Sequence, residues 1–231
     1  MIVFSAKVGV ALHGAANKVR DVHCWNEATG NGGTGILNLM SQNVFMGCYL
    51  DFTDLVLRNA QYISFSGGFF LGNAQVVFEA QAPNDAVQGV SLFGNVWYDC
   101  SLPSLSVNET LGVWASVTDL DLLGTSFCSA APQVGLPVAT LLASEPLPAP
   151  TWLDFSSILL FPHAGIASAT HTSSGCGSLS GLSSIASALP TPQLRVLVDS
   201  AGCNQTRLTV DQSRRSSWSS AFHGISAARG S

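Results

Sequence analysis

The chain has 231 residues, of which 47% are apolar and only 10% are charged, and its formal net charge is -5. This length is enough to bury one large core or two modest ones. The nine lysines and arginines are scattered along the chain and form no basic stripe, so we expect no nucleic-acid partner. Every apolar run is broken well before the roughly 20 residues that a membrane-spanning helix needs, so we expect no membrane partner either.

The apolar residues come in short runs rather than at helical spacing. Residues 63–70 and 75–78 are examples, and both runs are rich in phenylalanine, valine or isoleucine. Such runs favour short strands that are buried on both faces, as in parallel sheets.

Cysteines and sequons bear on the compartment of the protein. The six cysteines are too widely spaced for a zinc site, which usually contains a close Cys-x-x-Cys pair, so disulfides in a secreted protein are the better interpretation. Two N-glycosylation sequons, at Asn108 and Asn204, point the same way. The first residues show no signal-peptide pattern, so we expect either a cytoplasmic protein or a fragment.

In chain order, four segments superimpose over the first part of the sequence when Cys24, Cys48, Gly68 and Asn95 are taken as equivalent. Their spacing lies within the range of roughly 20–50 residues that indicates a repeat architecture, in which each unit buries its apolar face against its neighbours. Glycine and asparagine every few residues rule out helical repeats. The unit is therefore a coil of short strands, and the predicted fold is an all-β parallel β-helix.

Ladders of like residues should fill the interior of such a β-helix. We expect Trp25, Tyr49, Phe69 and Val96 to form one interior ladder, with adjacent rungs roughly 4.8 Å apart. Cys24 and Cys48 would be adjacent rungs of another ladder, either as buried thiols or as a disulfide.

Beyond Asp99 the repeat fades. We expect β-helix coils over residues 1–129 and a proline-rich linker over residues 130–150. Residues 151–212 should form a small C-terminal β appendage, and residues 213–231, rich in serine and arginine, should be a disordered tail.

Several segments resemble, in the same order, the plant quartet-type polygalacturonases. The matching segments are residues 18–36, 48–53, 69–72, 152–156 with 159–162, and 210–212. This family belongs to the pectin-lyase-like superfamily of right-handed parallel β-helices. The resemblance implies a secreted cell-wall protein that hydrolyses the homogalacturonan of pectin, a role in carbohydrate metabolism, and no cofactor or metal. The Asn-Thr-Asp, Asp-Asp, Gly-His-Gly and Arg-Ile-Lys motifs that polygalacturonases generally carry are absent as such, so no catalytic residue is carried over by motif.

Charged residues that recur with the repeat are the candidate catalytic groups. Inverting hydrolysis of a glycosidic bond needs two carboxyl groups roughly 6.5–9.5 Å apart, a separation that coils one or two rungs apart can provide. Asp51 and Asp99 end corresponding strands, Asp99 one place later in its repeat, and Asp54 follows closely after Asp51. We expect these three to include the acid and the base. The alternative is that they cap turns where the coil bends.

Candidate substrate-binding residues are His23, Lys18 and Arg20. His23 could bind a sugar carboxylate or assist proton transfer, or else lie packed at the end of a strand. Lys18 and Arg20 could pair with galacturonate carboxylates, or else be solvated charges at the edge of a coil. We expect one of two functions for the chain. The first is a pectin hydrolase, and the second is a non-catalytic carbohydrate-binding or structural β-helix remnant that truncation has inactivated. The oligomeric state stays open.

Overall fold

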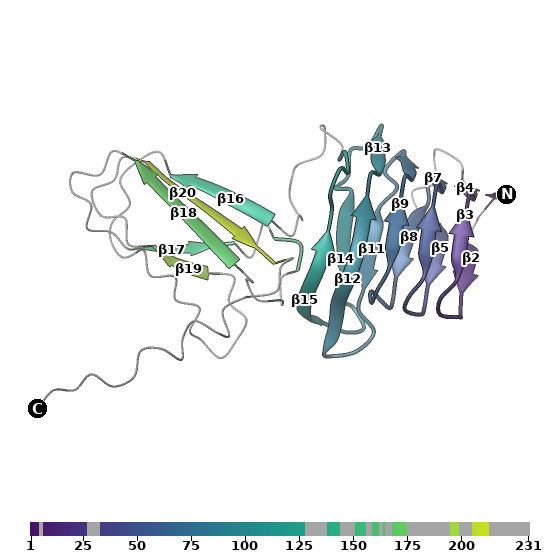
Figure 1. The fold of residues 1–231 in the computed structure, drawn as a ribbon, viewed down its shortest axis with the longest axis horizontal. Coiled ribbons are helices and arrows are strands. Elements are labelled where there is room, and N and C mark those ends of the chain that lie inside the picture. Colours follow the sequence, from purple (N-terminus) through teal and green to yellow (C-terminus); the bar gives the residue numbers. More distant parts are fainter. Residues whose placement is uncertain are drawn as a thin grey trace, which may run out of the picture.

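In the computed structural model every described element of regular structure is a β-strand, and most of these strands form one elongated stack of coils (Figure 1). The structure describes residues 1–4, 7–26, 33–127, 138–143, 151–155, 159–161, 164, 168–174, 195–198 and 205–212. Three parallel sheets run along the stack, which confirms the predicted parallel β-helix.

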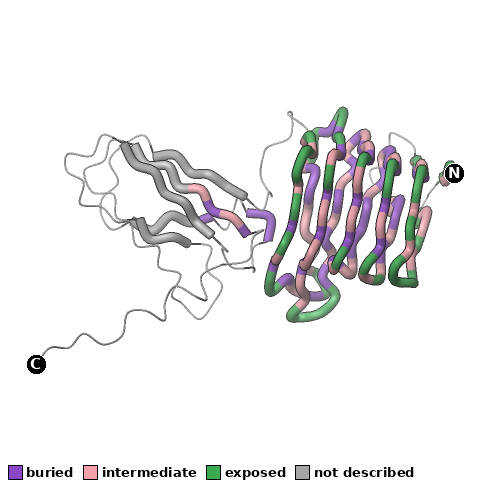
Figure 2. The backbone as a smooth tube through the Cα atoms, in the orientation of Figure 1, coloured by how far each residue is buried: buried purple, intermediate pink, exposed green. Residues whose placement is uncertain are grey.

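Each complete coil gives one strand to each of the three sheets. Sheet A consists of β1 (Ile2–Phe4), β4 (His23–Trp25), β7 (Tyr49–Asp51), β10 (Phe69–Leu71) and β13 (Val96–Tyr98). Sheet B consists of β2 (Val8–Leu12), β5 (Thr34–Asn38), β8 (Asp54–Leu57), β11 (Val76–Glu79) and β14 (Leu105–Asn108). Sheet C consists of β3 (Lys18–Arg20), β6 (Val44–Met46), β9 (Ser64–Ser66), β12 (Asp85–Phe93) and β15 (Trp114–Asp121). Buried residues alternate with more exposed ones along the coils (Figure 2), as expected for strands that point successive side chains to opposite faces.

The interior ladder of sheet A differs from the predicted one. Tyr49, Phe69 and Val96 are in register, as the repeat predicts, but His23 and not Trp25 is the partner of Tyr49. The buried apolar residues of these strands are the central ones, Cys24, Leu50, Phe70 and Trp97. The predicted ladder of Trp25, Tyr49, Phe69 and Val96 was therefore wrong, because these four side chains lie on the outer face of sheet A.

The wrong ladder came from treating Cys24 and Cys48 as equivalent positions of the repeat. Cys24 lies in β4 opposite Leu50, whereas Cys48 lies in the corner before β7. Both are buried free thiols, so of the two predicted alternatives the thiols are confirmed. Cys100 is bonded in a disulfide.

Left-handed residues turn the chain from sheet C to sheet A in every coil. Asp21, Gly47, Gly67, Gly94 and Gly124 occupy this corner with φ between 52° and 66°. Glycine is favoured there because it lacks the Cβ that makes this conformation costly for other residues. The corner fixes where the outward residues of sheet A begin.

Beyond the coils the chain forms antiparallel strands. β20 (Gln205–Asp211) pairs with β16 (Val138–Ala143) and with β18 (Ser168–Ser174), and β17 (Thr151–Asp154) pairs with β19 (Arg195–Val198). Residues 138–143 thus join the sheet of the appendage, although we expected them in the linker. The expected disordered tail lies outside the described residues.

One aromatic contact joins Phe161, from beyond the coils, to Phe78 of the β-helix. Phe161 is fully buried and packs edge-on against Phe78 of β11, with ring centroids 5.2 Å apart. The buried Gln212 holds this segment through hydrogen bonds with both the backbone nitrogen and the backbone oxygen of Phe161. The described residues include no helix long and apolar enough to cross a membrane.

Candidate functional site

The outer face of sheet A carries an unusual number of rings. Two rows of side chains point outward there, and five members of these rows are the aromatic residues Phe4, Trp25, Tyr49, Phe69 and Tyr98. Three of them expose large fractions of their surface: Phe4 55%, Trp25 41% and Tyr98 65%. Exposed rings in register form a surface on which apolar faces of a ligand can stack.

Two polar side chains meet in the middle of this face. The Nε2 atom of His23 lies 3.8 Å from the Oδ2 atom of Asp51, across the strands β4 and β7. The imidazole ring stacks on the ring of Tyr49, with centroids 4.3 Å apart and planes 4° from parallel. The separation of His23 and Asp51 is too long for a hydrogen bond, so the two side chains form an ion pair only when the imidazole is protonated and the carboxyl is ionised.

Both groups retain unused hydrogen-bonding capacity. The Nε2 atom of His23 and the Oδ1 atom of Asp51 are buried, and neither has a hydrogen-bond partner. Buried polar atoms in folded proteins are nearly always paired. Among the described residues, Asn59 Oδ1 and Ser104 Oγ are further exceptions, so what distinguishes His23 and Asp51 is that their two unpaired atoms belong to one pair on the aromatic face. His23 and Asp51 are the two predicted site residues that the structure brings together.

Burial also changes the acidity of this pair. Loss of hydration raises the pKa of the Asp51 carboxyl above its ordinary range, and the nearby His23 offsets part of that rise. The pKa of the Tyr49 hydroxyl is raised as well, first by burial and then by the charge of Asp51. A carboxyl with a raised pKa keeps its proton at a higher pH, as a general acid requires.

Asp54 lies on a different sheet from Asp51. It is the first residue of β8 in sheet B, and its Oδ1 atom accepts a hydrogen bond of 2.9 Å from the backbone nitrogen of Gln75. Burial raises the pKa of Asp54 to about 6, although the hydrogen bond from Gln75 acts in the opposite direction. Asp54 therefore links two coils of sheet B.

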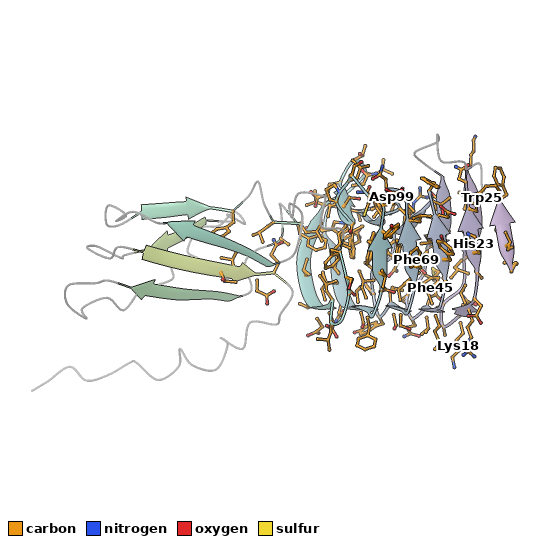
Figure 3. The ribbon with its side chains drawn as sticks, turned by 90° about the horizontal axis from the view of Figure 1, so that it is seen from above. Lys18, His23, Trp25, Phe45, Phe69 and Asp99 are labelled. Carbon is orange, nitrogen blue, oxygen red and sulfur yellow. The ribbon has the colours of Figure 1, made fainter. Side chains whose placement is uncertain are left out.

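Asp99 lies at the edge of sheet A, one residue after β13. It is exposed and has a φ of 55°, like Phe52 and Gly72 at the same corner of the preceding coils. Asp99 is two coils from Asp51, a separation of about 9.6 Å along the axis at a rung spacing of ~4.8 Å. Figure 3 labels Asp99 on the same side of the β-helix as Trp25.

Lys18 and Arg20 lie away from this face. Both are exposed residues of β3, in sheet C. Figure 3 shows Lys18 on the side of the β-helix away from Trp25 and Asp99. The structure thus does not bring these two cations to the His23–Asp51 pair. Among the described residues, no group of three or more His, Cys, Asp and Glu side chains could hold a metal ion.

Trp25 and Tyr49 lie on this outer face, although the sequence predicted both in the core. The signal that would have found them is the central residue of each three-residue strand. Aligning the strands on Cys24, Leu50, Phe70 and Trp97, instead of on the cysteines, puts every flanking side chain outside.

The chain is thus a parallel β-helix with a carboxyl–imidazole pair on an aromatic outer face, and comparison with known proteins gives this class a closer definition. Over 99 residues the chain is 40% identical to the polygalacturonase QRT3 of Arabidopsis thaliana. The match covers 42% of this chain and 20% of that protein, so the chain spans about a fifth of the length of the relative. No family model and no solved structure matches it. The chain is polygalacturonase-like over part of its length.

Proposed function

We propose that the protein is a polygalacturonase-like glycoside hydrolase that is secreted into the plant cell wall and acts there on the homogalacturonan of pectin. The observation that carries the proposal is the His23–Asp51 pair, whose buried polar atoms have no partner on an exposed aromatic face. The similarity to a polygalacturonase supports pectin as the polysaccharide.

In the proposed reaction Asp51 is the general acid. In its protonated form the carboxyl donates its proton to the glycosidic oxygen as the bond from that oxygen to the anomeric carbon breaks, and its raised pKa extends the pH range over which it holds that proton. Asp99, exposed and two coils away, is the proposed base that takes a proton from the attacking water. The axial separation of about 9.6 Å lies just above the range for inverting enzymes, roughly 6.5–9.5 Å, so the two side chains must lean toward each other by a small amount.

His23 is the proposed binding group for the uronate carboxylate. Its imidazole is held flat against Tyr49, so the ring cannot turn away from the outer face without losing that stacking. A protonated imidazole pairs with a carboxylate through a charge-assisted hydrogen bond. Trp25 provides an exposed ring beside the pair, on which a sugar ring can stack. Lys18, Arg20 and Asp54 lie on other sheets and take no part in this proposal.

The test is release of reducing ends from polygalacturonate by the purified chain and by an Asp51→Asn variant. The matched control is Asp21→Asn, an exposed residue at the corner between sheets C and A, where asparagine tolerates the left-handed conformation. We expect the Asp51 variant to lose at least a hundredfold in rate and the control to keep its rate. Equal rates for the wild type and the Asp51 variant would exclude Asp51 as the acid.

A second candidate is a non-catalytic carbohydrate-binding module. The observation that favours it is the row of exposed rings, which requires no chemistry to hold a polysaccharide. Affinity electrophoresis in gels that contain polygalacturonate separates the two candidates. Retardation of the wild type and of Asp51→Asn, without release of reducing ends by either, supports the binding module.

A further inference from the structure

The sequon Asn108-Glu109-Thr110, which the proposed function does not use, begins at the last residue of β14 and continues into the turn that follows. The Oδ1 atom of Asn108 accepts hydrogen bonds from the backbone nitrogen of Thr110, at 3.0 Å, and from the Oγ1 atom of Thr110, at 2.6 Å. This arrangement is an Asx-turn with the threonine hydroxyl folded back onto the asparagine side chain. Among the described residues, none hydrogen-bonds to the Nδ2 atom of Asn108.

The turn needs only local contacts to form. Both hydrogen bonds to Asn108 join residues two positions apart, so the Asx-turn can form before the coil is complete. In the folded chain, Glu109 fixes the next segment by accepting a hydrogen bond of 2.9 Å from the backbone nitrogen of Trp114. The sequon conformation is therefore accessible both to the nascent chain and to the folded protein.

We propose that Asn108 is an N-glycosylation site. The co-reactant is an oligosaccharide carried on a polyprenyl diphosphate. The Nδ2 atom of Asn108 forms a bond to the anomeric carbon of the first sugar, the bond from that carbon to the diphosphate breaks, and the Nδ2 atom loses one proton to the enzyme's base. The two hydrogen bonds to Oδ1 stabilise the negative charge that develops on this oxygen as Nδ2 loses its proton.

The position of Asn108 suits a bulky substituent. β14 is the last strand of sheet B, so no further described strand pairs with its outer edge. Thr110 is exposed, and the next residue, Leu111, exposes 66% of its surface. The turn leads from sheet B to sheet C, at the corner opposite sheet A, so a glycan at Asn108 leaves the His23–Asp51 face open.

The test is translation of the full chain, behind a cleavable secretory leader, in the presence of endoplasmic-reticulum microsomes. An Asn204→Gln background removes the second sequon, so any shift in electrophoretic mobility that peptide N-glycosidase reverses belongs to Asn108. We expect one such shift, its loss in Asn108→Gln and in Thr110→Val, and its retention in Thr110→Ser. The valine matches threonine in shape but lacks the hydroxyl that bonds to Oδ1.

Glycosylation is scored only on translocated chains, which are those that an added protease cannot digest in intact microsomes. The result therefore does not depend on whether a variant completes folding. Digestion with peptide N-glycosidase should also convert Asn108 to aspartate in the peptide that contains it, which mass spectrometry detects. Translocated Asn204→Gln chains that carry no glycan, or a Thr110→Val variant glycosylated as fully as the parent, would overturn the proposal.

Discussion

Among the buried polar groups of the β-helix, Asn43 and the His23–Asp51 pair have their hydrogen-bonding groups satisfied to different degrees. At the corner from sheet B to sheet C, Asn43 is fully buried and uses its whole amide. Its Oδ1 atom accepts from the backbone nitrogen of Asn17 at 2.8 Å, and its Nδ2 atom donates to the Oδ1 atom of Asn38 at 2.7 Å. On the outer face of sheet A, in contrast, His23 and Asp51 each hold a buried polar atom that has no partner.

This difference distinguishes buried polar groups that stabilise the fold from buried polar groups that can bind a ligand. A fully bonded buried network fixes the backbone of successive coils and leaves nothing for a ligand. An unbonded buried pair costs the folded state free energy, and it can recover that free energy when a ligand supplies the missing bonds. The fully bonded Asn43 should therefore matter for stability and the His23–Asp51 pair for binding.

The largest expected effect is at the corner. Replacing Asn43 with alanine leaves the backbone nitrogen of Asn17 and the Oδ1 atom of Asn38 without this partner, so we expect the free energy of unfolding to fall by about 3 kcal/mol. Urea denaturation measures the change, with the exposed Asn84→Ala as the control at less than about 0.5 kcal/mol. A loss for Asn43→Ala as small as that of the control would remove one side of the contrast.

Asp54 is an intermediate case, with one carboxyl oxygen bonded, and it should give the next effect as a pH dependence of stability. Its pKa rises from 3.8 to about 6 on folding, so between these values the folded state holds more protons than the unfolded state. The free energy of unfolding should therefore fall as pH rises through this window. Asp54→Asn keeps an acceptor for the Gln75 nitrogen and should flatten the slope in urea denaturation at several pH values. An unchanged slope in the variant would contradict the shift.

A smaller effect is expected for the exposed ring of Trp25. Trp25→Ala should weaken binding of oligogalacturonates about tenfold, or about 1.4 kcal/mol, through loss of a stacking surface. The control is Phe93→Ala, which removes a ring that is 50% exposed on β12 of sheet C. Isothermal titration calorimetry compares the two variants. Equal weakening by both would mean that the ligand does not distinguish sheet A from sheet C.

The smallest effect should be that of Asp51→Asn on stability. Because burial disfavours the charged carboxylate, removing its charge should leave the free energy of unfolding at pH 7 within about 0.5 kcal/mol of the wild type or raise it. Urea denaturation measures this change on the same scale as Asn43→Ala. A loss as large as the one expected for Asn43→Ala would place Asp51 among the structural residues.

The sequence predicted the architecture because the glycines and the apolar runs recur with the coil. The last two steps of the repeat were correct, since Gly68 and Asn95 do follow Cys48 at equivalent corner positions. The facing of the side chains was less predictable. A three-residue strand such as Tyr49–Asp51 has a single inward residue, so alternation gives almost no signal, and aromatic residues on the outer face resemble core residues in composition.

The candidate site was predictable only in part. Asp51 and His23 could be selected because charged residues are scarce, but their approach to 3.8 Å depends on the register of β4 against β7. The alignment on Cys24 and Cys48 misplaced that register, because the partner of Cys24 is Leu50. The placement of Lys18 and Arg20 on sheet C depended on the corner at Asp21, whose left-handed conformation the sequence does not reveal.

The most direct test of the account is an NMR titration of the histidine side chains with an oligogalacturonate of defined length. The chain has five histidines, and a His23→Gln variant assigns the signal of His23. If the unpartnered pair is the ligand site, the imidazole signals of His23 should shift in a saturable way, and the shift should change in the Asp51→Asn variant. Saturable binding that leaves the His23 signals unmoved would contradict the account.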